Sequence, residues 1–396
     1  MRNLLLATAA TAMLGSVAVA DGHAVKVGVI LGFTGPIESL TPNMADSAEL
    51  ALKEVSDSGA FLDGKVIEPV RADSTCVDAA AATAAAERLV TADGVMAIMG
   101  ADCSGVTTAV ANNVAIPNGV VMVSPSATSP ALSTIEDNGL FFRTAPSDAR
   151  QGEVLANVLM DKAITSVAVT YTNNDYGKGL SDSFISNYEG LGGSITINAS
   201  HEDGKGDYSA EVGALAAAGG DLLVVLGYAD QGGVGIIQSS IDSGAFETFA
   251  LGDGMYADSL IEAIGPDLDG TIGTVPWSEG EGTDAFAAAS AEAGVNGDSS
   301  FTRESYDAAA LIALAMQAGG EATREAVAAN LLAVANGPGE PILPGELGKA
   351  LEILAGGGEI DYVGATNVEL IGPGEAAGTY REYEVISGAY ETVSFR

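Results

Sequence analysis

Short apolar runs rich in valine and isoleucine alternate with longer amphipathic or alanine-rich stretches along most of the chain. Residues 25–33 form the first such run, and residues 44–55 behind it have helical character. Near-continuous hydrophobic strands that alternate with helices are typical of parallel sheets covered on both faces. Further strands are predicted at residues 66–73, 96–100, 120–124, 141–144, 166–171, 195–200, 222–227, 249–251 and 272–275. Further helices are predicted at residues 79–90, 208–217, 235–243 and 305–317.

These strands fall into two series, which are interrupted near Pro146 and again near Pro276. The pattern predicts an α/β fold with two doubly wound parallel-sheet lobes. The helix at 305–317 follows the second series, which favours a return of the chain to the first lobe. We therefore expect lobe 1 to comprise residues 21–146 and 276–360, and lobe 2 to comprise residues 147–275 and 361–396. Several crossings of the chain would then form a multi-strand hinge.

The first twenty residues have the pattern of an export signal. Arg2 precedes a mostly apolar and uncharged run, and Ala18-Val19-Ala20 has the small-x-small order that signal peptidase requires. Cleavage there would leave Asp21 as the first residue and would place the protein in the periplasm. A buried N-terminal helix is the alternative, and the run is too short to span a membrane.

The charge of the chain limits the classes of partner, and its cysteine content predicts a disulfide. The chain has 53 acidic and 16 basic residues, with a formal net charge of −37, which would repel nucleic acid and anionic lipid. Its two cysteines, Cys76 and Cys103, would meet an oxidising compartment after export, and we expect a disulfide between them. Two free buried thiols are the alternative.

The usual signatures of catalysis are missing from the sequence. Neither His23 nor His201 has a partner at metal-ligand spacing. The stretch 59–65 has the spacing of a phosphate-binding loop, but Val66 stands where Ser or Thr should follow, and a strand is predicted there in place of a helix. We therefore expect no enzymatic activity, no catalytic residues, no metal ion and no cofactor.

Small polar residues follow four predicted strands, at the edge where open α/β sheets bind ligands. In the first series, Ser104 and Thr128 offer hydroxyl groups, and the helix expected after Cys103 offers free amides, to a carboxylate. In the second series, Asp253 lies between two glycines and could neutralise an ammonium. Each feature alone also fits a helix cap, a polar loop or an ordinary turn. Together they favour a zwitterionic ligand.

The chain resembles the periplasmic leucine/isoleucine/valine-binding proteins of ABC transporters, which have the type I binding-protein fold. The resemblance covers nearly the whole expected mature chain, and no single motif carries it alone. The matching stretches are Gly35-Pro36, the two cysteines, Cys103-Ser104, Ser124-Pro125-Ser126-Ala127-Thr128, Asp175-Tyr176-Gly177, Phe301 with Tyr306, and Tyr362-Val363-Gly364-Ala365.

The resemblance implies roles for individual residues. Ser104 and Thr128 would hold the ligand carboxylate, and the Ser126 carbonyl, the Thr128 hydroxyl and Asp253 would accept from its ammonium. Family members often have Glu where this chain has Asp253, so the acidic arm is shorter here. Tyr176 and Tyr228 would close over the ligand. Phe301 and Leu40 would lie beside the ligand side chain. Cys103 and Ala127, which adjoin Ser104 and Thr128 in the sequence, are also expected to contact the ligand.

The resemblance also implies a function. The chain is expected to be a monomeric periplasmic component of an ABC importer that closes two lobes around an apolar amino acid and docks on a membrane permease. The alternative keeps the fold but changes the ligand to an amide, a urea-like compound or a small carboxylate.

Overall fold

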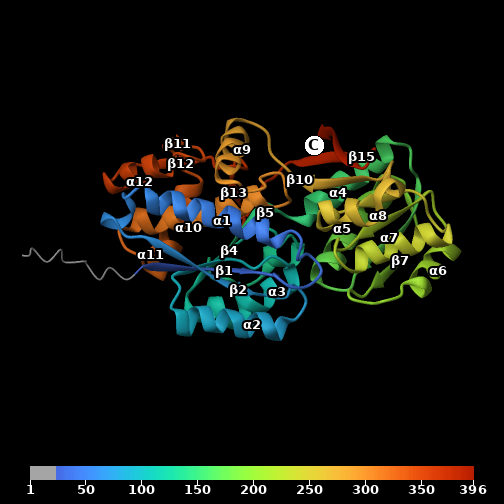
Figure 1. The fold of residues 1–396 in the computed structure, drawn as a ribbon, viewed down its shortest axis with the longest axis horizontal. Helices are drawn as coiled ribbons and strands as arrows, with labels where there is room; N and C mark the ends of the chain where they lie inside the picture. The colour runs from blue at the N-terminus through green and yellow to red at the C-terminus, as the bar shows by residue number, and fades with distance from the viewer. Residues whose placement is uncertain (1–23) are drawn as a thin grey trace, which may run out of the picture.

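The computed structural model describes residues 24–396, so the expected signal peptide, residues 1–20, lies outside the described part of the chain. Two α/β lobes lie side by side, each built on a seven-stranded sheet (Figure 1). The predicted fold class is therefore confirmed. No helix within residues 24–396 is long and apolar enough to cross a membrane.

The first sheet has the strand order β13-β14-β5-β4-β3-β1-β2. Its central strands are parallel and largely buried because helices cover both faces. Helices α1 and α10 lie on one face and α2 and α3 on the other (Figure 1). The strands are β1 (Val25–Leu31), β2 (Ile67–Asp73), β3 (Ala97–Gly100), β4 (Val121–Ser124) and β5 (Phe141–Pro146). The helices are α1 (Thr41–Asp57), α2 (Ala79–Arg88), α3 (Ser104–Val110) and α10 (Thr302–Gly319).

The second sheet has the order β16-β15-β10-β9-β8-β6-β7. Its five central strands are parallel, and a C-terminal antiparallel hairpin extends one edge. The strands are β6 (Ser166–Thr172), β7 (Ser194–His201), β8 (Leu222–Leu226), β9 (Phe249–Leu251), β10 (Ile272–Pro276), β15 (Tyr380–Ile386) and β16 (Ala389–Phe395). The helices are α4 (Asp148–Asp161), α5 (Asp175–Gly190), α6 (Ser209–Ala218), α7 (Gly232–Ser243) and α8 (Asp258–Ile264).

The chain passes between the lobes after β5, after β10 and after β14. The segment 361–376 was expected in lobe 2, but this expectation is wrong because β13 (Leu370–Ile371) and β14 (Glu375–Ala376) extend the first sheet beside β5. An ion pair between the buried Arg143 and Glu375 holds this edge in place. The other first-lobe elements are α9 (Glu281–Ala293), α11 (Arg324–Ala335), α12 (Leu347–Ala355), β11 (Glu340–Ile342) and β12 (Ile360–Tyr362).

A cation–π cluster lies where the chain crosses between the lobes. Trp277 directly follows β10, and the guanidinium groups of Arg303 and Arg381 lie 3.7 and 4.2 Å from the centre of its ring. Arg303 belongs to α10 in the first lobe, whereas Arg381 belongs to β15 in the second lobe. Cation–π contacts from both lobes therefore converge on one side chain.

The predicted disulfide is present between Cys76 and Cys103. It joins the loop after β2 to the residue before α3. This covalent link fixes one wall of the region between the lobes.

Candidate functional site

A cavity lies between the lobes, at the carboxyl ends of strands from both sheets. About 340 Å³ of space that no protein atom fills, open solvent included, lies among the residues that line it. Its lining residues are Ile37, Leu40, Met44, Asp102, Cys103, Ser104, Ser126, Tyr176, Tyr228, Asp253, Gly254 and Phe301.

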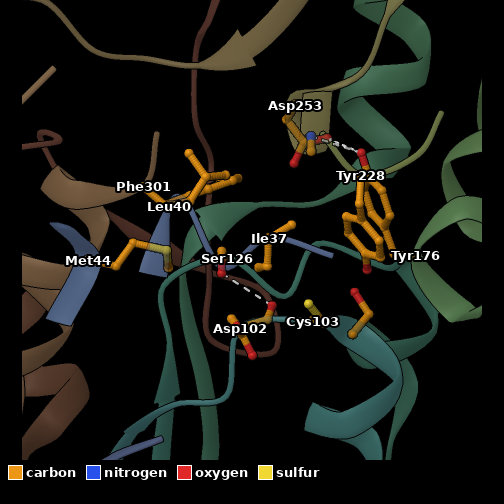
Figure 2. Close-up of a pocket in the computed structure, with 12 residues that line it drawn as sticks. Ile37, Leu40, Met44, Asp102, Cys103, Ser126, Tyr176, Tyr228, Asp253 and Phe301 are labelled. Carbon is orange, nitrogen blue, oxygen red and sulfur yellow. Dashed lines mark hydrogen bonds between the residues drawn. The ribbon is translucent and has the colours of Figure 1, made fainter. Parts of the chain in front are cut away.

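Apolar side chains from the first lobe form one side of the cavity (Figure 2). Leu40 is the N-cap of α1, and Met44 lies one helical turn further along. Residues four positions apart lie on the same helical face, so both side chains are directed to the same side. Phe301, the N-cap of α10, lies beside them. This side can receive an apolar group.

Two stacked tyrosines from the second lobe form the opposite side (Figure 2). The ring centres of Tyr176 and Tyr228 are 5.1 Å apart. The Tyr176 hydroxyl donates to Asp253 Oδ1 at 2.7 Å and accepts from the Gly254 amide at 3.1 Å. Tyr176 therefore fixes the position of the Asp253 carboxylate.

Asp253 is only 2% exposed, and burial raises its pKa to about 6. The hydrogen bond that the Tyr176 hydroxyl donates to this carboxylate opposes the rise. A buried carboxylate of this kind is stabilised in its charged form by a cation placed against it.

Hydroxyl and amide donors lie on the first-lobe side. Ser104 Oγ accepts from the Ser129 amide at 3.1 Å, which leaves the Ser104 hydroxyl proton free to donate. Ser104 is also the first residue of α3, where backbone amides have no partner within the helix. These groups can bind a carboxylate.

All the residues expected to bind the ligand line this cavity except Ala127 and Thr128, which are fully buried behind it. The loop is folded on itself there, because the Ser124 hydroxyl accepts from the Ala127 amide at 2.9 Å. The Ala127 carbonyl accepts from Arg143 at 3.0 Å.

Four further lining residues were not predicted. Ile37 and Met44 lie three residues before and four after Leu40, a helical spacing that could have indicated them. Gly254 adjoins Asp253. Asp102 accepts from the Gly32 amide at 2.6 Å and from Ser74 Oγ at 2.9 Å, and no pattern in the sequence distinguishes it.

The lobes touch at a second place, beside the loop that precedes α1. Asp230, which follows β8, accepts from the Ser39 amide at 2.8 Å, and its own amide donates to the Pro36 carbonyl at 3.1 Å. Ser259 donates to the same carboxylate at 2.6 Å. We call this group of four residues the Asp230 clasp. It holds the lobes together across the cavity.

The charge of the cavity favours a ligand with a positive group. Among the lining residues that the structure describes, Asp102 and Asp253 are acidic and none is Lys or Arg. Over residues 24–396, no group of three or more His, Cys, Asp or Glu side chains is placed to hold a metal ion.

Comparisons with known proteins agree with this architecture. A family model described as periplasmic binding protein matches residues 24–343. Leu/Ile/Val-binding protein homolog 1 of Brucella melitensis is 32% identical over 272 residues, which cover 68% of this chain and 70% of that protein.

Two solved structures share the fold. The branched-chain amino acid transporter substrate binding protein LivJ from Streptococcus pneumoniae, in complex with isoleucine, has a TM-score of 0.76 at 24% identity, covering 93% of this chain and 99% of that one. A solute binding protein from R. palustris, in complex with 4-hydroxybenzoate, has a TM-score of 0.75 at 20% identity, covering 94% and 97%.

Proposed function

Because the chain belongs to the periplasmic binding protein family, we propose that it is the substrate-binding component of an ABC importer and that its ligand is an apolar amino acid. Its permease partner would lie in the inner membrane, and the protein itself in the periplasm. It would bind the ligand and release it unchanged, without catalysis.

The observation that carries the proposal is the division of the cavity into three chemically different parts. The buried Asp253 would receive the ammonium, and Ser104 with the first amides of α3 would receive the carboxylate. Cys103 and Ser126 also line the cavity, and the Ser126 carbonyl would accept from the ammonium. The apolar side formed by Leu40, Met44 and Phe301 would hold the ligand side chain. Tyr176 and Tyr228 would cover the ligand from the second lobe.

Closure of the two lobes on the ligand would follow from which lobe supplies each of these groups. The carboxylate donors belong to the first lobe, whereas Asp253 belongs to the second. A zwitterion therefore makes its full set of contacts only when the lobes are together, and binding favours the closed state through this difference.

A ligand without an ammonium group fits this cavity less well. The 4-hydroxybenzoate bound by the R. palustris protein carries a carboxylate and no cation. Such a ligand would face Asp102 and Asp253 with no lysine or arginine among the described lining residues. Unpaired negative charges in a buried site repel one another.

Calorimetry and thermal shift can test the proposal with leucine and with 4-methylpentanoate, which is leucine without its ammonium. We expect leucine to raise the melting temperature through mass action and 4-methylpentanoate to have no effect. Asp253→Asn should abolish measurable leucine binding, whereas Asp267→Asn, a change at an exposed position, should preserve it. Binding of 4-methylpentanoate or 4-hydroxybenzoate in preference to every amino acid would contradict the proposal.

A further inference from the structure

The lobes also touch at a third place, where α5 of the second lobe meets α3 and the short helix η5 (Pro130–Thr134) of the first lobe. Gly179 lies on α5 at this contact. A Cβ atom there would lie 2.8 Å from Pro130 Cδ and 3.0 Å from Ser129 Oγ. Cδ belongs to the rigid proline ring, which cannot rotate away as a flexible side chain can. A side chain at position 179 would therefore collide with the opposite lobe.

The glycine has a cost within its own lobe. Glycine in the interior of a helix destabilises that helix relative to alanine, and Gly179 is well inside α5. Its backbone is helical, so no special conformation requires glycine at this position. The close approach of the other lobe is the feature that explains it.

The first-lobe side of the contact is anchored to the ligand site. The Ser129 amide donates to Ser104 Oγ at 3.1 Å, and the Ser129 carbonyl accepts from Arg143 at 2.9 Å. Arg143 is buried and also binds Glu375. A shift of Ser129 away from α5 would break its bond to Ser104, which we expect to hold the ligand carboxylate.

The second-lobe side is anchored as well. Tyr176 lies one turn before Gly179 on α5 and donates to Asp253 Oδ1 at 2.7 Å. Helix α5 packs closely on α4, because a Cβ atom on Gly152 would lie 2.5 Å from the Phe184 amide nitrogen. How closely α5 approaches the first lobe therefore sets where Tyr176 and Asp253 lie relative to the ligand.

We propose that Gly179 is a positioning residue for closure, which lets α5 dock on Pro130 and so brings Tyr176 and Asp253 to the ligand. Gly179 is not among the residues that line the cavity. The inference rests on the proposed function and adds a contact that acts through the lobes. When the lobes separate, position 179 gains room, so a side chain there would disfavour the closed state alone. Ordinary packing that persists in the open state is the competing explanation.

Gly179→Ala should change affinity and stability in opposite directions. Leucine affinity, measured by calorimetry, should fall at least about fivefold because the closed state becomes overpacked. The melting temperature of the unliganded protein should rise, since alanine favours the helix and the open lobes leave space for its methyl group. Gly213→Ala in α6, where an added Cβ meets open space, is the matched control. It should raise the melting temperature and keep the wild-type affinity.

Pro130 provides a second test, because Pro130→Ala removes the Cδ atom that the new methyl group would meet. The loss of affinity caused by Gly179→Ala should be smaller in the Pro130→Ala protein than in the wild type. An equal loss in both proteins would contradict the proposed contact.

Two further results would overturn this inference alone. One is an unchanged leucine affinity in Gly179→Ala, in a wild-type protein that binds leucine. The other is a lower melting temperature of the unliganded variant, which would show that the contact exists without closure. A wild-type protein that binds no amino acid would overturn the proposed function as well.

Discussion

At the scale of single residues, Asp253 owes its position to the glycines on both sides. A Cβ atom on Gly254 would lie 2.6 Å from the Gly227 carbonyl oxygen and 3.0 Å from the Tyr176 hydroxyl. A Cβ atom on Gly252 would lie 3.1 Å from the same hydroxyl. Larger residues at either place would separate Tyr176 from the carboxylate that it holds.

The raised pKa of Asp253 predicts how leucine affinity depends on pH. The ammonium favours the ionised carboxylate, so binding must supply the energy of deprotonation once the pH falls below about 6. We expect the dissociation constant to be constant between pH 7 and 8 and to rise toward pH 5. Calorimetry across this range checks the expectation, and a constant affinity down to pH 5 would contradict it.

Sequence reasoning could identify Asp253 because an acidic residue between two glycines after a buried strand is a recognisable local pattern. Asp102 has no such pattern. Asp102 is selected by contacts with Gly32 and Ser74, which are distant in the chain.

At the scale of elements, the hydrophobic strands of both series were predictable, whereas the two-residue strands and the glycine-rich start of one helix were not. Strands β13 and β14 contain two residues each, too few to show any periodicity. Helix α7 begins at Gly232, three residues before the predicted start. The prediction began too late because glycines are poor helix formers. Close packing explains why glycine stands at this position, because a Cβ atom on Gly233 would lie 2.2 Å from the sulfur of Met255.

The disulfide is the feature at this scale with the clearest energetic consequence. It closes a loop with a sequence separation of 27, which should stabilise the protein by about 3.5 kcal/mol through the entropy of the unfolded chain. Denaturation with and without reductant should show this loss in the free energy of unfolding. The Cys76→Ser, Cys103→Ser variant serves as the control, because reductant should have no effect on it.

At the scale of the whole molecule, the contacts between lobes decide which state is favoured. The two-lobed architecture was predictable, since two complete series of strands need two sheets. The Asp230 clasp was not, because Ser39 and Asp230 are 191 positions apart and neither belongs to a recognisable motif. Such pairs are defined only by how the lobes close.

Loss of the Asp230 clasp should favour the open state. Asp230→Ala removes the hydrogen bond that the Asp230 carboxylate accepts from the Ser39 amide across the lobes, so leucine affinity should fall roughly tenfold, mainly through faster dissociation. Stopped-flow kinetics measure both rates. Asp242→Ala, on the exposed surface of α7, should leave them unchanged, and an unaltered dissociation rate in Asp230→Ala would show that the contact does not contribute to closure.

Trp277, whose ring contacts two guanidinium groups at the crossings, is the only tryptophan in the chain. Tryptophan fluorescence therefore comes from a single residue, and the arginines that contact this residue come from opposite halves of the protein. Rotation of the halves would change the quenching of that indole ring, so Trp277 is an intrinsic fluorescent reporter of the conformation of the protein. Titrating ligand while recording emission should follow the movement directly, without any attached dye.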